Sequence, residues 1–211
     1  WTLATYLLEG RLLTFQRPQA AALRLIYTGV ANILIGTVGV MVLIRLFLTT
    51  SGVSRPDFYG FIGTGRVLLG LASGLTLGLI FFSILSWPSH NPTLFLNAYM
   101  QVLVVSTAEV LVCWVLLGGS IVNAGRSPAN YFFAVFVSAL AFGVYHYGHS
   151  PPFNTLKMAG FLTIIGLATG VFYFLTRSVY GTIFFHNFLG TKGVIDALAA
   201  RDALDSYSDP Q

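Results

Sequence analysis

The segment LFLNAYMQVLVVSTAEVLVCWVLLGGSIV, residues Leu94–Val122, is almost wholly apolar and holds one charged side chain, Glu109. It is longer than the roughly 20 apolar residues that an α-helix needs to cross the hydrocarbon core of a bilayer. An ionised carboxylate at the centre of a bilayer costs roughly 2.5 to 3.5 kcal/mol on insertion scales. The segment therefore predicts a membrane-spanning helix whose acid is directed into a helix bundle rather than at lipid.

The composition of the whole chain indicates the same environment. Of its 211 residues, 9% are charged and 55% are hydrophobic, and the mean hydropathy is +0.78, which is outside the usual balance of soluble globular domains. The net charge of +4 fits contact with anionic lipid headgroups. Nucleic-acid binding is excluded as a function, because no basic cluster interleaves with exposed aromatic residues. The single cysteine, Cys113, cannot form an intrachain disulfide.

Apolar segments recur along the chain and predict an all-α polytopic membrane protein, a bundle of about six transmembrane helices. The predicted spans are residues 25–48, 67–87, 94–122, 130–147, 158–175 and 179–189, of which the last is too short to cross alone. Amphipathic helices are expected at both termini: an interfacial helix over residues 1–18 and a short surface helix with a polar tail over residues 193–211. The connecting loops are short, so we expect one integral, multi-pass membrane domain over residues 1–211.

Small residues spaced four apart occur in two of the predicted spans. Gly74 with Gly78, and Gly166 with Gly170, form GxxxG pairs. Such pairs let the backbones of two helices approach closely. We therefore expect these faces to lie against other helices.

Glu109, His146 and His186 lie in three different predicted spans. A carboxylate and two imidazoles at membrane depth can build a general-base site that activates water or a metal site, and no local motif such as HExxH selects between them. The alternative for Glu109 is a protonated side chain hydrogen-bonded to a neighbouring helix, and for each histidine a solvated side chain near a helix end. His149 is expected at the rim of its helix, and His90, in the turn PSHNP, is expected to face solvent.

Two motifs in the second half of the chain carry a family resemblance. The stretch Phe142–His146, FGVYH, has the spacing Phe-x-x-x-His, and residues 161–190, FLTIIGLATGVFYFLTRSVYGTIFFHNFLG, form two predicted helices with a short polar break and His186 in the second. In this order the motifs resemble the CPBP family, the CAAX-protease and bacteriocin-processing membrane proteins also called the ABI or Rce1-like family. The resemblance covers about residues 100–190, and it implies an all-α membrane core.

The resemblance also implies roles for the polar residues. In active members, the first acid of a Glu-Glu-x-x-x-Arg motif and the histidine that matches His146 activate a water. The histidine and asparagine of a His-x-x-x-Asn motif stabilise the oxyanion, and His186 matches that histidine. The asparagine position, four residues later, is Gly190 in this chain. Asn187 follows His186 directly and is expected to point elsewhere, because successive residues are about 100° apart around a helix.

The Glu-Glu-x-x-x-Arg motif is degenerate in this chain. If Glu109 is the second acid, the first acid is replaced by Ala108 and the arginine by Cys113. If instead CWVLLGG, residues 113–119, aligns with the motif, Cys113 and Trp114 replace the acids and Gly118 replaces the arginine. In both registers the first acid and the arginine are absent, which predicts that no carboxylate reaches a water held by His146.

Three functions follow from these observations. The first is a non-catalytic CPBP-fold protein acting as an accessory, assembly or scaffold subunit of a larger hetero-oligomeric complex, with other membrane proteins and lipid as partners. The second is an active intramembrane endopeptidase that uses Glu109, His146 and His186. The third is a subunit in which His146 or His186 ligates a chlorin or haem, since imidazole is a competent axial ligand. We expect no resident cofactor or metal, with zinc at these histidines as the alternative.

Overall fold

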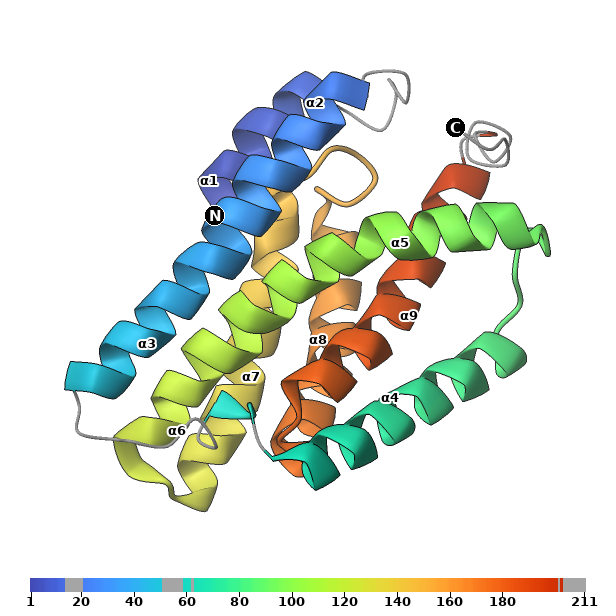
Figure 1. The fold of residues 1–211 in the computed structure, drawn as a ribbon. Coiled ribbons are helices and arrows are strands. Elements are labelled where there is room, and N and C mark those ends of the chain that lie inside the picture. The colour runs from blue at the N-terminus through green and yellow to red at the C-terminus, as the bar shows by residue number, and fades with distance from the viewer. Residues whose placement is uncertain (14–20, 51–58, 62, 201, 203–211) are drawn as a thin grey trace.

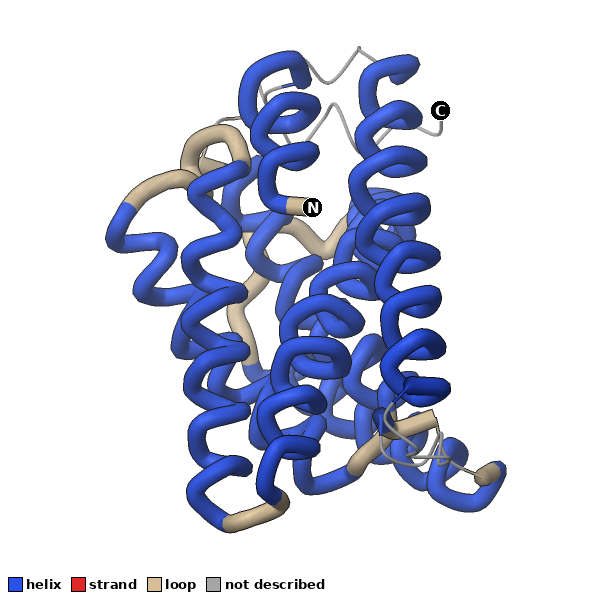
Figure 2. Tube along the Cα trace, turned by 90° about the vertical axis from the view of Figure 1, so that its left-hand side faces the viewer, coloured by secondary structure: helices blue, strands red, loops and turns tan. Residues whose placement is uncertain are grey.

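The computed structural model describes residues 1–13, 21–50, 59–61, 63–200 and 202. Over these residues the chain is built from helices joined by short connections, with no strand (Figures 1 and 2). The all-α prediction is therefore confirmed. Residues 14–18 of the predicted N-terminal helix, and residues 203–211 of the predicted tail, lie outside the described residues.

The helices follow one another in chain order, and several of them continue without a break into a π-helical segment. Their bounds are α1 (Thr2–Thr5), η1 (Tyr6–Leu13), α2 (Ala21–Ile26), η2 (Tyr27–Gly39), α3 (Val40–Thr50), α4 (Thr64–Ile84), α5 (Pro92–Glu109), η4 (Val110–Gly118), α6 (Gly119–Gly125), α7 (Pro128–Tyr145), the 3₁₀ turn η5 (His146–Gly148), α8 (Leu156–Thr176) and α9 (Val179–Ala199).

Local sequence signals explain where four of the long helices begin. The side chains of Asn91, Ser127, Thr155 and Ser178 each accept a hydrogen bond from a backbone N–H in the first turn of α5, α7, α8 and α9 respectively. Asn, Ser and Thr are preferred at this position because the first N–H groups of a helix have no partner within it. Proline follows the cap in α5 and α7, where its missing N–H has no cost.

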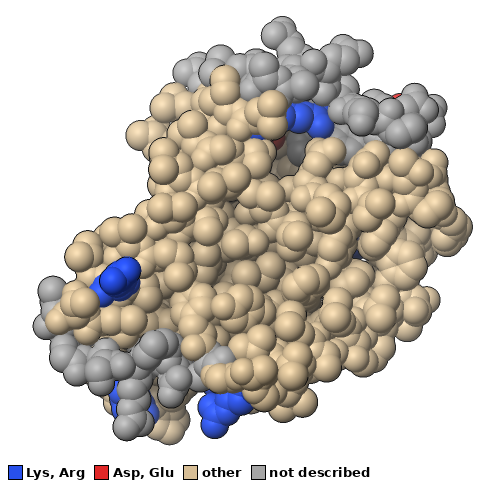
Figure 3. Space-filling model, viewed as in Figure 1, with Lys and Arg blue, Asp and Glu red and all other residues tan. Residues whose placement is uncertain are grey.

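Within the part of the chain that the structure describes, five helical stretches are long and apolar enough to cross a membrane: residues 24–49, 64–84, 92–125, 128–148 and 156–176. Large apolar side chains on these helices are directed outward, among them Leu68, Phe132, Ile164 and Leu175. In the face shown in Figure 3, Lys and Arg side chains lie towards the two ends of the molecule, and the surface between them carries almost none. An exposed apolar surface of this extent is the surface of a protein embedded in lipid. The chain is an integral, multi-pass membrane protein.

The last predicted span is longer than expected from the sequence. Helix α9 continues to Ala199 and packs against α4, α5 and α8 (Figure 1). Ile195 and Leu198 are each 1% exposed and pack with Leu94 and Ala98 of α5. The prediction of a separate surface helix with a polar tail over residues 193–211 is therefore wrong over its described part. Its apolar residues extend the buried face of α9, because their near-helical spacing continues that of the preceding span.

The N-terminal helix is amphipathic, but its polar face is directed inward. Leu3 and Leu7 are exposed, whereas Thr5 and Glu9 are buried. Trp1 stacks on Tyr145 of α7, with ring centroids 3.6 Å apart. This orientation suits a helix at a bilayer, where the outer medium is apolar and the polar groups find partners inside the protein.

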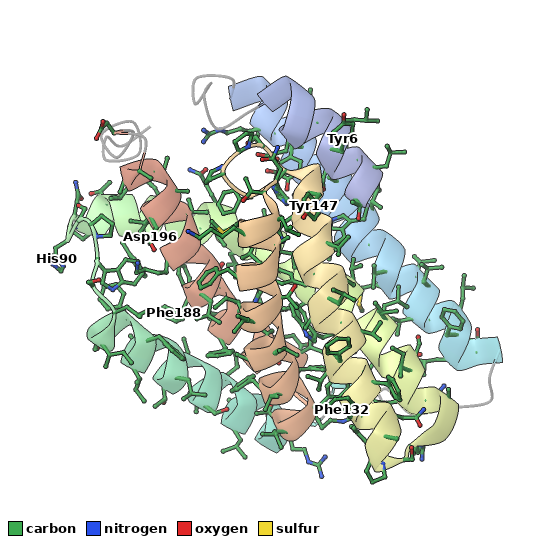
Figure 4. The ribbon with its side chains drawn as sticks, turned by 180° about the vertical axis from the view of Figure 1, so that it is seen from behind. Tyr6, His90, Phe132, Tyr147, Phe188 and Asp196 are labelled. Carbon is green, nitrogen blue, oxygen red and sulfur yellow. The ribbon has the colours of Figure 1, made fainter. Side chains whose placement is uncertain are left out.

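Both GxxxG pairs lie at close helix contacts, as predicted. A methyl group at Gly74 would collide with the backbone of Gly181 in α9, and one at Gly78 with the ring of Phe188, which extends from α9 towards α4 (Figure 4). On α8, a methyl group at Gly166 would lie 2.9 Å from the Cα of Ala139 in α7. These glycines set how close α4 and α8 come to their neighbours.

Replacing Gly74 by alanine is expected to destabilise the fold by about 1 to 3 kcal/mol, the usual cost of inserting a methyl group into a packed interior. The backbone of Gly181 can move away only by separating α4 from α9. The matched control is Gly65→Ala in the same helix, where a methyl group meets nothing within 4 Å. Thermal unfolding in detergent micelles measures both variants, and equal melting temperatures would contradict the packing argument.

Candidate active site

Glu109 is buried at the point where α5 passes into the π-helical segment η4. Its exposed fraction is 5%, and its neighbours Ala108 and Val110 are fully buried. The two segments form one continuous helix with α6. π-Helical turns inside longer helices are frequent at functional sites.

Two imidazoles from other helices reach the carboxylate of Glu109. His186 Nε2, from α9, lies 3.1 Å from Oε2 of Glu109. His146 Nε2, at the end of α7, lies 3.6 Å from Oε1. All three side chains are buried. Glu109 faces the bundle interior as predicted, and both histidines face it too. Segments distant in sequence thus meet at one carboxylate.

The second nitrogen of each imidazole is bonded to an oxygen. His146 Nδ1 lies 2.8 Å from the carbonyl oxygen of Phe142, which can only accept, so Nδ1 carries the proton. His186 Nδ1 lies 2.9 Å from Oγ1 of Thr169, and that hydroxyl donates its own proton to the carbonyl of Ile165. Nδ1 of His186 is therefore also the donor.

These bonds determine what faces Glu109. With the proton of each neutral imidazole on Nδ1, Nε2 of both rings is a lone-pair acceptor, and so is an ionised carboxylate. The 3.1 Å contact between Glu109 and His186 therefore requires a proton between them, held by one of the two groups. The cluster is an acid–base pair that can hold a proton and release it.

A second carboxylate, Glu9 of the N-terminal helix, bonds the loop after α7. Its Oε2 accepts from the backbone N–H of Ser150 at 2.8 Å, and its Oε1 accepts from the Ser150 hydroxyl at 2.6 Å. His149 Nδ1 lies 3.2 Å from Oε2 of Glu9. Burial alone would raise the pKa of Glu9, but the hydrogen bonds and charge of His149 and the bonds from Ser150 hold that pKa below its ordinary value of 4.5.

The expectation that His149 is a rim residue is wrong. Its side chain is 10% exposed, and its ring stacks on that of His146 with centroids 4.9 Å apart. The turn η5 follows α7 and directs His149 back towards the interior, against the ring of His146, rather than out from the end of the helix. The sequence prediction did not include Glu9 in the site, because a contact between residues 9 and 149 leaves no signal in the local sequence.

The contacts of Glu109 bear on a third register of the Glu-Glu-x-x-x-Arg motif. If Glu109 is aligned with the first acid, Val110 takes the position of the second acid and Trp114 that of the arginine. Trp114 is fully buried, with its ring 5.1 Å from that of His186.

Gly190 stands at the asparagine position of the His-x-x-x-Asn motif, as the sequence indicates. A Cβ at Gly190 would lie 2.8 Å from Cγ1 of Val102, so an apolar side chain of α5 stands where an amide would need room. Asn187 points away from the cluster, and its amide donates to the carbonyl of Tyr99 at 3.1 Å. The hydrogen-bonding groups around Glu109 are therefore histidine side chains, without the asparagine amide of the motif.

Three ligand atoms of the cluster are close enough for a shared cation: one each from Glu109, His146 and His149 lie within 4.8 Å of one another. Axial ligation of a chlorin or haem fits less well. His146 and His186 both direct Nδ1 at an oxygen and Nε2 at Glu109, so ligating such a group needs reorientation of the ring.

Comparison with protein families agrees with the resemblance noted in the sequence. The family described as type II CAAX prenyl endopeptidase Rce1-like matches residues 91–190. This range contains Glu109, His146 and His186. No curated protein and no solved structure shows a significant match to the chain.

Replacing Glu9 by glutamine is expected to loosen the N-terminal helix. The substitution keeps the size of the side chain but removes the charge, and a hydrogen bond to a charged group contributes about 1.5 to 3 kcal/mol. Hydrogen exchange of residues 2–9 should be faster in Glu9→Gln than in wild type. Leu3→Ala, at an exposed position of the same helix, is the control and should leave exchange unchanged. Equal protection in wild type and Glu9→Gln would show that these bonds do not hold the helix.

Proposed function

We propose that this membrane protein is an intramembrane endopeptidase that acts on prenylated or membrane-embedded peptides. The match of residues 91–190 to the Rce1-like family supports the proposal. One observation carries the proposal. The carboxylate of Glu109 lies between His146 and His186, at 3.6 and 3.1 Å. The registers considered from the sequence leave no carboxylate within reach of His146, and the contact with Glu109 supplies one.

The first step is activation of water by Glu109 and His146. The separation of 3.6 Å between Oε1 and Nε2 is longer than a hydrogen bond, and both atoms are acceptors. A water placed against both donates one O–H to each, which leaves an oxygen lone pair free to attack a carbonyl carbon. A positioned base of this kind contributes roughly 10² to 10⁴ in rate.

The second step is stabilisation of the oxyanion by His186. When the proton between Glu109 and His186 resides on the imidazole, the ring is a cation whose Nε2–H is directed at Glu109 and whose Nδ1–H donates to Thr169. A fixed positive charge beside the reacting carbonyl stabilises the charge of a tetrahedral intermediate. The water oxygen forms the new C–O bond, and transfer of its abstracted proton from Glu109 to the leaving amine accompanies cleavage of the C–N bond.

A non-catalytic subunit is the second candidate function. It is favoured by the replacement of three motif residues. With Glu109 as the first acid, Val110 stands at the second acid, Trp114 at the arginine and Gly190 at the asparagine. An accessory or scaffold subunit would use the same helix bundle to bind other membrane proteins in a hetero-oligomer and would need the buried cluster only for stability. The two functions differ in whether the purified protein cleaves peptides.

The activity test uses the protein purified in detergent micelles and a fluorogenic prenylated CAAX peptide. Wild type should cleave it, and Glu109→Gln and His146→Ala should each lower kcat by at least about 10²-fold, because each removes a partner of the attacking water. His90→Ala, in the exposed turn before α5 (Figure 4), should leave kcat unchanged. Absence of cleavage by a wild-type protein that unfolds cooperatively would favour the non-catalytic subunit.

Restoring the missing amide gives a second test. The double variant Gly190→Asn with Val102→Ala removes the side chain that would meet the new Cβ and adds a donor one helical turn after His186. A single oxyanion donor is worth roughly 10² to 10³ in kcat in other hydrolases, so the double variant should cleave faster than wild type. Val102→Ala alone is the control. A double variant that folds and shows no gain over the control would argue against His186 facing the oxyanion.

A further inference from the structure

Ser106 of α5 carries a buried hydroxyl without a hydrogen-bond partner. The residue is 0% exposed, and its Oγ has no partner among the described residues. Other buried hydroxyls in the bundle are satisfied within their own helix, since Thr169, Thr182 and Thr191 each donate to the carbonyl oxygen four residues earlier. An unpartnered polar group inside a protein is rare and calls for a specific explanation.

The Ser106 hydroxyl lies beside α9, one helical turn from the Glu109 carboxylate. Ser106 and Glu109 are three positions apart on one face of α5, and side chains at this spacing are neighbours, with Cβ atoms about 5 to 6 Å apart. On α9, Gly190 follows His186 by four positions. A Cβ added at Gly190 would lie 3.5 Å from Oγ of Ser106. The hydroxyl is therefore on the same α5–α9 contact as the buried carboxylate.

Glycine at position 190 brings the molecular surface close to this hydroxyl. Gly190 is partly exposed, whereas His186, one turn earlier on α9, is 1% exposed. The other side chain that borders Gly190 is that of Val102, which is apolar and offers no hydrogen bond. A carbonyl group that enters over Gly190 therefore meets the hydroxyl of Ser106.

The imidazoles of His146 and His186 give an oxyanion a positive charge but no free N–H. Both N–H groups of protonated His186 already have partners, Nε2–H at Glu109 and Nδ1–H at Thr169. Nδ1 of His146 donates to a backbone carbonyl. A hydrogen bond to the negative oxygen of a tetrahedral intermediate therefore has to come from another side chain, and the Ser106 hydroxyl has a proton to give.

We propose that Ser106 is a catalytic residue whose Oγ–H donates to the substrate carbonyl oxygen, an inference that rests on the proposed endopeptidase function. As water adds to the carbonyl carbon, this oxygen becomes negative, and a fixed donor stabilises it. A reacting group needs to lie about 3 Å from both the nucleophile and the oxyanion donor. A hydroxyl about 5 to 6 Å from Glu109 meets that condition. Its partner is then the substrate.

The first test compares kcat for the fluorogenic prenylated CAAX peptide in detergent micelles. Ser106→Ala should lower kcat by about 10²- to 10³-fold, the effect of removing one oxyanion donor in other hydrolases, with KM little changed. Ser138→Ala is the matched control, because Ser138 of α7 is also fully buried and its hydroxyl also lacks a partner among the described residues. This control should keep the kcat of wild type.

The second test needs no turnover. A ketomethylene analogue of the prenylated peptide, with a ¹³C-labelled ketone in place of the scissile amide, binds without being hydrolysed. A hydrogen bond weakens the C=O bond, so the infrared carbonyl band should lie at lower wavenumber in the complex with wild type than in the complex with Ser106→Ala. Ser138→Ala should give the wild-type band, and thermal unfolding of each variant shows whether it folds.

The two tests separate this inference from the endopeptidase function. Cleavage by wild type with kcat and carbonyl band unaffected by Ser106→Ala would overturn the role of Ser106 and leave the endopeptidase standing. A band shifted by Ser106→Ala, with no cleavage by wild type, would support the bond to the carbonyl and contradict the endopeptidase. Folded wild type that neither binds the ketone nor cleaves the peptide would overturn both.

Discussion

The contact of Glu109 with two imidazoles is the constraint on which the rest of the structure depends. A carboxylate in a membrane helix must have partners, because burying it alone costs several kcal/mol. His146 and His186 supply them from α7 and α9, and this fixes the rotation of both helices about their axes. The glycines of α4 and α8 then allow those helices to close around the cluster.

The N-terminal helix belongs to the same polar interior. Glu9 bonds Ser150 and His149 in the loop that follows α7, and the ring of His149 stacks on that of His146. A substitution in the first turns of the chain can thus reach the site through two side-chain contacts. The outward face of this helix, with Leu3 and Leu7 exposed, is left for lipid.

The sequence predicts the parts of this arrangement that have a local signal. A lone acid in an apolar span has to face the interior, and FGVYH places His146 at a helix end, so Glu109 and His146 follow from the chain alone. The position of Glu109 in the Glu-Glu-x-x-x-Arg motif does not, because the sequence shows the spacing of the residues but not which histidines meet the carboxylate. The inward return of His149 depends on the turn η5, and its bond to Glu9 joins positions 140 apart in the chain, which no periodicity encodes.

A double-mutant cycle on Glu109 and His186 tests the central contact most directly. Glu109→Leu, His186→Leu and the double variant are compared with wild type by their free energies of unfolding in detergent micelles. Each single substitution should be strongly destabilising, by about 3 to 5 kcal/mol, because it leaves a buried polar partner alone. The double variant should cost less than the sum of the two, with a coupling energy of about 0.5 to 3 kcal/mol. Two costs that simply add would mean that the side chains do not interact, and would contradict the account.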